Sequence, residues 1–197
     1  MGVFSWLVGC EEASSSQEEV ELRKVVFLGL DGAGKTSTVR RLNPSNHANH
    51  YLPTFGESVS VFDVFGLFTM ACWDVGGDEW MRLNWKDYVV GASAVVYFID
   101  AHEVKRLPEA VTELHNILRL PSLRTLPLLI IANKCDFYSH LDEDKMRNLL
   151  KPIIKSHPSV NLFVCSARTG QGIQPAFTWL GKELIRQQDD FWLQKRR

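Results

Sequence analysis

The chain has 197 residues, of which 45% are hydrophobic and 23% are charged, and its formal net charge is −1. These values are typical of one globular domain with a sizeable core, and the balanced charge argues against nucleic acid as a partner. The four cysteines are scattered without a C-x-x-C pair, so we expect neither a disulfide framework nor a zinc site, and a cytoplasmic, reducing location is the default.

Continuous apolar runs alternate with amphipathic segments along most of the chain. The apolar runs predict buried strands in residues 23–30, 91–100, 126–133 and 160–167, and a hairpin with Gly66 near its turn in residues 59–75. The amphipathic segments predict helices over residues 34–42, 104–120, 142–156 and 174–187. This alternation favours a mainly parallel α/β sheet with helices on both faces.

The two ends of the chain differ from this globular pattern. Residues 1–10 are apolar, and residues 11–19 are polar and rich in serine, as in a linker. We therefore expect three parts: an N-terminal amphipathic segment and linker over residues 1–19, a domain over residues 20–187, and a tail over residues 188–197 that forms the frayed end of the last helix. No apolar run reaches the length of a membrane span.

The first predicted strand leads directly into GLDGAGKT, residues 29–36. This segment matches G-x-x-x-x-G-K-[ST], in which a glycine-rich loop wraps backbone N–H groups around phosphates at the start of a helix. Lys35 would reach the β and γ phosphates, and the Thr36 hydroxyl would bind Mg²⁺. We therefore expect a P-loop site for a nucleoside triphosphate, with contacts from Gly29, Asp31, Gly32, Ala33, Gly34, Lys35, Thr36 and Ser37.

A second strand ends in WDVGGDEW, residues 73–80. P-loop proteins hold Mg²⁺ with the P-loop hydroxyl and an acid at the end of a second strand. We expect Asp74 to be that acid, placed behind the direct metal ligands. The glycine pair that follows lets a backbone N–H of Gly77 approach the γ-phosphate, because small residues permit a close contact.

Asp78 stands where Ras-like enzymes carry a glutamine that orients the attacking water. Aspartate is shorter and negatively charged, so it would repel the γ-phosphate in a partly desolvated site. Since a water-orienting group contributes about 10²- to 10⁴-fold, we expect intrinsic hydrolysis to be slower by a factor in that range. Lys35 is the other catalytic candidate. The alternative is that Asp78 faces solvent and another group orients the water.

The sequence NKCD, residues 133–136, follows another predicted strand. Guanine presents N1–H and an exocyclic amine, two parallel donors that the Asp136 carboxylate can accept together. Adenine lacks that amine, so the same carboxylate rejects it. The Lys134 stem can lie on the base, and a backbone N–H in CSA can donate to guanine O6. We therefore expect guanine binding by Asn133, Lys134, Asp136, Ser166 and Ala167.

Together these motifs resemble the ADP-ribosylation factor family of small GTPases. GLDGAGKT and WDVGG are closer to its Arf-like branch than to Ras or Rab relatives, and the resemblance covers about residues 20–187. It implies a small-GTPase fold with a six-stranded, mostly parallel sheet, binding of GTP or GDP with Mg²⁺, and nucleotide-dependent movement of two loops. PTFG, residues 53–56, is similar to the family's switch I, so Thr54 would bind GTP and Mg²⁺.

Three features depart from the family pattern. Glutamine is usual at Asp78, and an aromatic residue is usual at Glu57, where it joins Trp73 and Tyr88 in an apolar patch that partners recognise. Because Glu57 interrupts this patch with a charge, ordinary Arf effectors are not expected to bind it. The segment between the two switches also looks longer than usual, so its strands are expected to slide differently or not at all.

Two tryptophans, Trp80 and Trp85, lie beside Arg82 in the segment that corresponds to switch II. Interface hot spots favour tryptophan and arginine, so this segment is a candidate partner site. Burial in the core would explain both tryptophans equally well.

The start of the chain is a candidate membrane anchor. Family members are often myristoylated at Gly2, but Trp6 stands where the M-G-x-x-x-[ST] pattern prefers a hydroxyl. One myristoyl chain binds membranes only marginally, and no basic residue precedes Arg23 to attract anionic lipid. Peripheral association with an intracellular membrane and packing against the domain or a partner both stay open.

The leading hypothesis is an Arf-like GTP-binding switch, acting in membrane traffic, that recruits protein partners and hydrolyses GTP slowly. The competing hypothesis is a non-cycling module that holds its nucleotide permanently as a structural subunit of a larger assembly. Asp78 and Glu57 favour the second hypothesis, whereas Lys35, Thr36 and Asp136 favour nucleotide binding under both.

Overall fold

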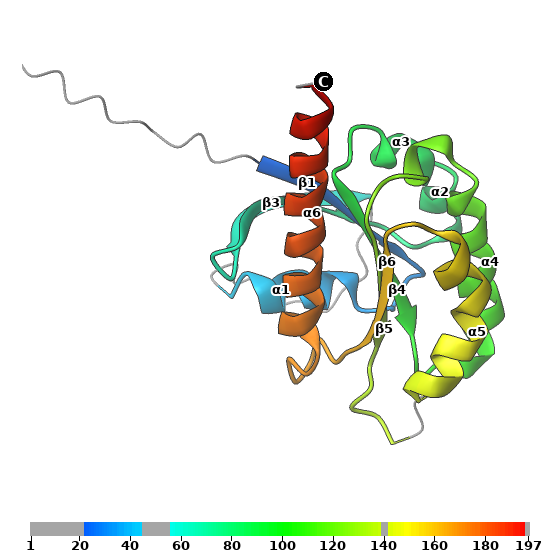
Figure 1. Ribbon diagram of the computed structural model, residues 1–197. Helices are drawn as coiled ribbons and strands as arrows, with labels where there is room; N and C mark the ends of the chain where they lie inside the picture. The colour runs from blue at the N-terminus through cyan, green and yellow to red at the C-terminus, as the bar shows by residue number, and fades with distance from the viewer. Residues whose placement is uncertain (1–21, 45–55, 139–141, 196–197) are drawn as a thin grey trace, which may run out of the picture.

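The computed structural model of the chain describes residues 22–44, 56–138 and 142–195, without the side chains of residues 191–194. Gly2 and Thr54 therefore lie outside the described residues. Within them, one six-stranded sheet has the strand order β2-β3-β1-β4-β5-β6 (Figure 1). Its strands are β1 (Leu22–Gly29), β2 (Glu57–Val64), β3 (Phe68–Val75), β4 (Ala94–Asp100), β5 (Leu128–Asn133) and β6 (Val160–Val164).

The sheet is mostly parallel, as predicted. β1 pairs in parallel with β3 and with β4, and the pairs β4–β5 and β5–β6 are parallel as well. β2 and β3 form the predicted antiparallel hairpin, in which Val64 lies opposite Phe68. Gly66 has a φ of 69° in its turn, and its N–H donates to Oδ2 of Asp63 at 2.6 Å. The turn residue therefore fixes the register of the hairpin.

Helices cover both faces of this sheet, with α1 and α6 on one side and α4 and α5 on the other (Figure 1). The helical elements are α1 (Lys35–Leu42), α2 (Glu79–Arg82), α3 (Trp85–Val89), η1 (Val104–Arg106), α4 (Leu107–Leu118), η2 (Pro121–Leu123), α5 (Glu143–Ser156) and α6 (Ile173–Lys195).

Side chains alternate between two hydrophobic cores along the central strand β1. Val26 and Leu28 pack into the core under α4 and α5, whereas Val25 and Phe27 pack into the core under α1 and α6. All four are fully buried. A strand between two covered faces needs apolar side chains on both, which is why the sequence there reads as a continuous apolar run.

Two helix boundaries differ from the predicted ones. The segment predicted as one helix over residues 104–120 divides into η1 and α4, because Pro108 lies in the first turn of α4 and favours a helix start there. The last helix does not end near Gln187 but continues to Lys195. Arg23 of β1 donates to Gln188 at 2.7 Å, and Arg186 pairs with Asp190 at 3.4 Å, so contacts support the extension.

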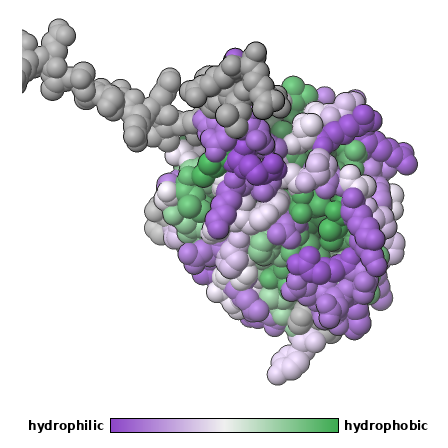
Figure 2. Space-filling view, viewed as in Figure 1, coloured by the Kyte–Doolittle hydropathy of each residue, from purple (hydrophilic) through white to green (hydrophobic). Residues whose placement is uncertain are grey.

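The surface is mostly hydrophilic in the view of Figure 2, with apolar side chains gathered near α5 and β6. β6 is an edge strand, and most of its residues are only half-buried. Among the described residues, no helix combines the length and the apolar character that crossing a membrane requires.

Candidate functional site

The predicted phosphate loop joins the end of β1 to the start of α1. Gly34 caps α1 with a φ of 93°, and a Cβ on it would lie 2.0 Å from Nδ2 of Asn133. Glycine is therefore required at this position by both conformation and space. The loop and the helix N-terminus together present backbone N–H groups of the kind that bind phosphate.

Lys35 lies beneath this loop and holds its shape. Its Nζ donates to the carbonyl oxygens of Gly29 at 2.7 Å and Leu30 at 2.9 Å. Burial lowers the pKa of Lys35 to about 8, since desolvation disfavours the charged form. An ammonium has three N–H donors, so Lys35 can support the loop and still donate to a phosphate oxygen.

The predicted metal-binding residues meet at the adjacent strand end. The Thr36 hydroxyl donates to Oδ2 of Asp74 at 2.6 Å, and Asp74 is 3% exposed at the end of β3. Hydroxyl and carboxylate oxygens are the donors that Mg²⁺ prefers, so the chemistry of this pair fits that ion. The structure thus brings Thr36 and Asp74 together as the sequence predicts, while Thr54 lies outside the described residues.

Gly77 packs directly against the phosphate loop. A Cβ on it would lie 2.3 Å from the backbone nitrogen of Asp31 and 2.3 Å from the carbonyl carbon of Leu30. From the sequence, this glycine is expected to permit a close approach of the nucleotide. The structure adds a second reason, since the protein backbone itself comes this close.

Asp78 follows as the N-cap of α2. Its Oδ1 accepts the backbone N–H groups of Trp80 and Met81, both at 3.1 Å. The side chain is half-buried on the wall of the cavity described below. Neither of the two predicted orientations, toward the γ-phosphate or toward solvent, anticipated this capping role.

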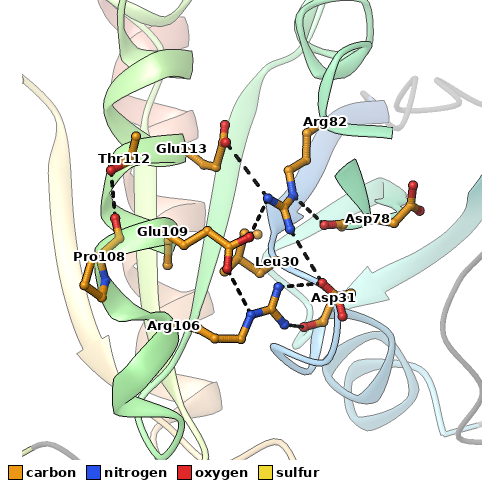
Figure 3. Close-up of polar contacts among 12 residues, drawn as sticks. Leu30, Asp31, Asp78, Arg82, Arg106, Pro108, Glu109, Thr112 and Glu113 are labelled. Carbon is orange, nitrogen blue, oxygen red and sulfur yellow. Dashed lines mark hydrogen bonds and ion pairs between the residues drawn. The ribbon is translucent and has the colours of Figure 1, made fainter. Parts of the chain in front are cut away.

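A charged network then fixes α2 against the rest of the domain (Figure 3). The Arg82 side chain is 8% exposed and contacts Asp31, Glu109 and Glu113 at 3.6, 2.7 and 4.0 Å. Its Nε donates to the carbonyl of Gly77 at 2.7 Å. Arg106 completes the network by pairing with Asp31 at 2.8 Å and with Glu109 at 3.0 Å.

Of this network, the sequence singles out only Asp31, as a phosphate-loop residue, and Arg82, for its tryptophan neighbours. Hydrogen bonds from Arg106 and then Arg82 lower the pKa of Glu109. One sequence pattern could have indicated the network. Arg106, Glu109 and Glu113 are spaced three and four residues apart, so a helix places their three charges on one face. The network links the phosphate loop, α2 and α4.

The base-recognition motifs converge at the far end of the same sheet edge. Asn133 donates to the Ala33 carbonyl at 2.8 Å, and its Oδ1 accepts the N–H of Ala167 at 2.9 Å. Lys134 pairs with Asp100 at 2.5 Å. Asn133 therefore ties the phosphate loop to the segment that contains Ala167.

The Asp136 carboxylate is held by its neighbours. Oδ1 accepts the Ser166 hydroxyl at 2.5 Å, and Arg168 donates to Oδ2. The hydrogen bond from Ser166 and the neighbouring Arg168 lower the pKa of Asp136, outweighing the effect of burial. The carboxylate is therefore ionised at neutral pH, as it must be to accept both N–H donors of guanine.

These residues surround one cavity of about 790 Å³, a size typical of small-molecule sites. The predicted residues that line it are Asp31, Gly32, Gly34, Lys35, Thr36, Ser37, Gly77, Asp78, Asn133, Lys134, Asp136 and Ala167. Gly29, Ala33 and Ser166 do not line the cavity. Instead they position lining residues: the Gly29 and Ala33 carbonyls accept hydrogen bonds from Lys35 and Asn133, and the Ser166 hydroxyl donates to Asp136. Gly76, of the predicted glycine pair, also lines it, as do five residues that the prediction missed: Arg40, Arg41, Pro44, Phe137 and Arg168.

The predicted partner surface lies beside this cavity. The rings of Trp73 and Tyr88 have centroids 6.2 Å apart, and the Tyr88 hydroxyl donates to Glu57 at 2.7 Å. Glu57 thus adds a charge to the patch, as predicted. Trp80 is 80% exposed, but Trp85 is only 1% exposed and donates to the Gly76 carbonyl at 3.0 Å. Trp80 therefore has the exposure that a partner site requires, and the alternative of core burial holds for Trp85.

The fold and the arrangement of these motifs define an α/β P-loop protein of the small-GTPase class. The family model described as "ADP-ribosylation factor family" matches residues 11–184. The chain belongs to this family.

Individual relatives agree with this assignment. The ADP-ribosylation factor-like protein alp41 of Schizosaccharomyces pombe is 33% identical over 168 residues, covering 85% of this chain and 88% of that protein. The ADP-ribosylation factor-like protein 3 of Chlamydomonas reinhardtii is 31% identical over 185 residues, covering 93% of this chain and 99% of that protein. The solved structure of the Arl6 BBS3 small GTPase from Trypanosoma brucei, with the bound nucleotide analogue GppNp, superposes with a TM-score of 0.77 at 26% identity, covering 85% of this chain and 99% of that one.

Proposed function

We propose that this chain is an Arf-like GTP-binding switch that recruits protein partners in its GTP state and hydrolyses GTP weakly. We infer weak hydrolysis from the capping role of Asp78, whose Oδ1 accepts the N–H groups of Trp80 and Met81. A glutamine amide can both donate and accept, whereas an ionised carboxylate only accepts. A carboxylate used to cap α2 is thus poorly suited to orienting an attacking water.

The reaction itself is a phosphoryl transfer to water. The water oxygen bonds to the γ-phosphorus, the bond from phosphorus to the β–γ bridging oxygen breaks, and the proton passes to a phosphate oxygen. Lys35 would stabilise the phosphate charge by donation from Nζ. Asp78 adds negative charge to the same cavity wall, so the rate should be lower by about 10²- to 10⁴-fold than with an oriented water.

Magnesium is the cation that this site suits. Thr36 would hold it directly, together with Thr54 outside the described residues, and Asp74 would orient the Thr36 hydroxyl through their 2.6 Å contact. When bound, Mg²⁺ neutralises charge on the β and γ phosphates.

Partner recruitment would use the surface formed by Glu57, Trp73, Tyr88 and Trp80. A partner for this surface needs apolar groups that pack on the rings and a hydrogen-bond donor for the Glu57 carboxylate. Partners that bind an entirely apolar patch lack that donor. Myristoylation at Gly2, peripheral membrane attachment and a role in membrane traffic belong to the same proposal, and they rest on the family and the sequence.

A second function is favoured by the Arg82 network. Because this buried side chain ties α2 to the phosphate loop and to α4, it opposes movement of switch II. The chain would then hold a nucleotide permanently as a structural subunit of an assembly. Thr36→Asn separates the two functions: it should abolish partner binding in a switch, but it should unfold a protein whose nucleotide is structural.

The test is the nucleotide content of the purified full chain. Protein prepared without added nucleotide would be denatured at intervals over hours at 37 °C, and the released nucleotides separated by ion-exchange chromatography. We expect bound GTP that stays GTP, whereas conversion to GDP within minutes would contradict weak hydrolysis.

Asp78→Gln is the matched variant, since it restores an amide at the same position. We expect it to hydrolyse bound GTP about 10²- to 10⁴-fold faster than the natural chain. Equal rates for the two proteins would show that residue 78 does not orient the water. Absence of any guanine nucleotide from both would contradict the proposed binding function itself.

A further inference from the structure

The base end of the cavity contains an arginine that the proposed function does not use. Arg168 directly follows Ala167, and its Nε and Nη2 approach Oδ2 of Asp136 at 2.7 and 2.5 Å. The other carboxylate oxygen, Oδ1, accepts the Ser166 hydroxyl at 2.5 Å. The carboxylate expected to read guanine is therefore already engaged by donors of its own chain.

Counting acceptor sites shows what this contact does to a guanine base. Each carboxylate oxygen has about two acceptor sites, and the two parallel donors of guanine need one site on each oxygen. Ser166 leaves a site on Oδ1, but Arg168 covers Oδ2 with a hydrogen bond from Nε and an ion-pair contact from Nη2. Guanine can therefore bind bidentately only after Arg168 moves away from Oδ2.

Arg168 is well placed to release Asp136. Its side chain is 70% exposed, whereas that of Asp136 is 7% exposed, so the arginine is the partner that can move. Its guanidinium carbon lies 5.6 Å from the centre of the Phe137 ring, a contact of the cation–π type. The Phe137 ring in turn stacks on His102 with centroids 4.5 Å apart. The side chain can thus leave the carboxylate and keep its aromatic neighbour.

The backbone of the same segment is fixed from the other side. Arg41 of α1 donates to the carbonyl oxygen of Ala167 at 3.2 Å and also to that of Arg168. Release of Asp136 therefore requires only a rotation of the Arg168 side chain, with the loop left in place.

We propose that Arg168 competes with guanine for Asp136, and so acts as a gate that slows nucleotide loading and sets its rate. This inference rests on the proposed function, because it concerns the same nucleotide site. Both the guanidinium and a guanine base would present N–H donors to Oδ2 of Asp136, so the two compete for the same carboxylate oxygen.

The size of the effect follows from the exposure of the arginine. If guanine binds only those molecules in which Arg168 has released Asp136, apparent affinity falls in proportion to their fraction. The strength of an exposed ion pair limits this reduction to about fivefold. Arg168→Ala should therefore raise the association rate of GDP by about two- to fivefold. Loss of a positive charge alone would have the opposite effect, because it weakens attraction of the polyphosphate.

The experiment measures association of a fluorescent GDP analogue by stopped flow, with the full chain freed of nucleotide by EDTA and gel filtration. Arg168→Lys keeps the charge but loses the fork of donors, so its rate should lie between those of the natural chain and Arg168→Ala. The matched control is Arg186→Ala on α6, where a 54% exposed arginine pairs with Glu183 at 2.8 Å away from the cavity. Added salt screens the Arg168–Asp136 pair, so the ratio between Arg168→Ala and the natural chain should fall toward one.

A faster rate in both Arg168 variants and an unchanged rate in Arg186→Ala would support the gate. Unchanged or slower association in both Arg168 variants would overturn it. If Arg168→Ala fails to fold, Arg168→Lys alone decides, since it preserves the charge and most of the stem. If the natural chain and all variants bind no guanine nucleotide, the proposed function fails and the gate fails with it.

Discussion

The guanidinium of Arg82 lies 2.7 Å from a carboxylate oxygen of Glu109, and only 8% of its side chain is exposed. The same guanidinium holds the carbonyl of Gly77 at 2.7 Å. One side chain thus joins the backbone next to Asp78 to helix α4 (Figure 3). Any displacement of α2 must separate a buried cation from its carboxylates, which is costly.

Arg82→Met should therefore destabilise the protein and release α2. The variant keeps an apolar stem of similar length but removes the charge, and it leaves Glu109 and Glu113 without their contact to Arg82. Because these carboxylates are 38% and 26% exposed, we expect a loss of about 1–3 kcal/mol in the free energy of unfolding, measured by urea denaturation. Amide hydrogen exchange in residues 76–89 should become faster.

The control for this change is Arg186→Met, which removes an arginine of α6 that is 54% exposed. Exposed ion pairs contribute little, so we expect its unfolding free energy to change by less than about 1 kcal/mol. If Arg82→Met were no more destabilising than Arg186→Met, the network would not hold α2.

Gly77→Ala tests the contact between switch II and the phosphate loop. The added Cβ would lie 2.3 Å from the backbone of both Asp31 and Leu30, so the two segments must move apart. We expect the affinity for guanine nucleotide to fall by at least about tenfold, since a shift of this kind disturbs the groups that hold phosphate. Gly91→Ala is the control, because it introduces strain at a φ of 69° without a close neighbour. Equal nucleotide affinities in the two variants would contradict the steric argument.

Much of this fold and site was predictable because the signals were local. The apolar run through Val25 and Leu28 identified a strand covered on both faces, and parallel strands bring their carboxyl ends to one edge. Motifs that follow those strands, at Lys35, Asp74 and Asp136, therefore had to meet. Their distance apart in the sequence does not affect this, because the pairing of the strands alone brings the strand ends together.

The remainder was not predictable because it depends on pairs of ordinary-looking residues. Arg82 and Glu109 are charges of the kind found on any surface, and only the packing of α2 against α4 buries one beside the other. Arg168 likewise follows the CSA segment without any motif, yet it reaches the Asp136 carboxylate. Asp78 was recognised as unusual from its position, but its capping role required the backbone of α2.

The capping role of Asp78 gives a third prediction, separate from catalysis. Asp78→Ala removes the acceptor for the N–H groups of Trp80 and Met81, and such losses cost about 0.5–2 kcal/mol. Asp78→Asn keeps a capping oxygen and should cost much less, although it also removes the negative charge. Thermal unfolding of both variants measures the difference. An equal loss in Asp78→Asn and Asp78→Ala would mean that the charge, and not the cap, is the stabilising feature.

The Arg82 network also predicts how stability depends on acid. Hydrogen bonds from Arg106 and Arg82 lower the pKa of Glu109 in the folded protein relative to the unfolded chain. Its stabilising contribution is therefore fully present above the ordinary glutamate pKa of about 4.3, and it is lost as the pH falls through the lower folded value. Glu109→Gln cannot titrate, so its free energy of unfolding should decline less steeply than that of the natural chain between about pH 5 and pH 3. Urea denaturation across this range measures both slopes. High salt should bring them together, because it screens these partly exposed pairs, and parallel slopes at low salt would show that the arginines do not act on Glu109.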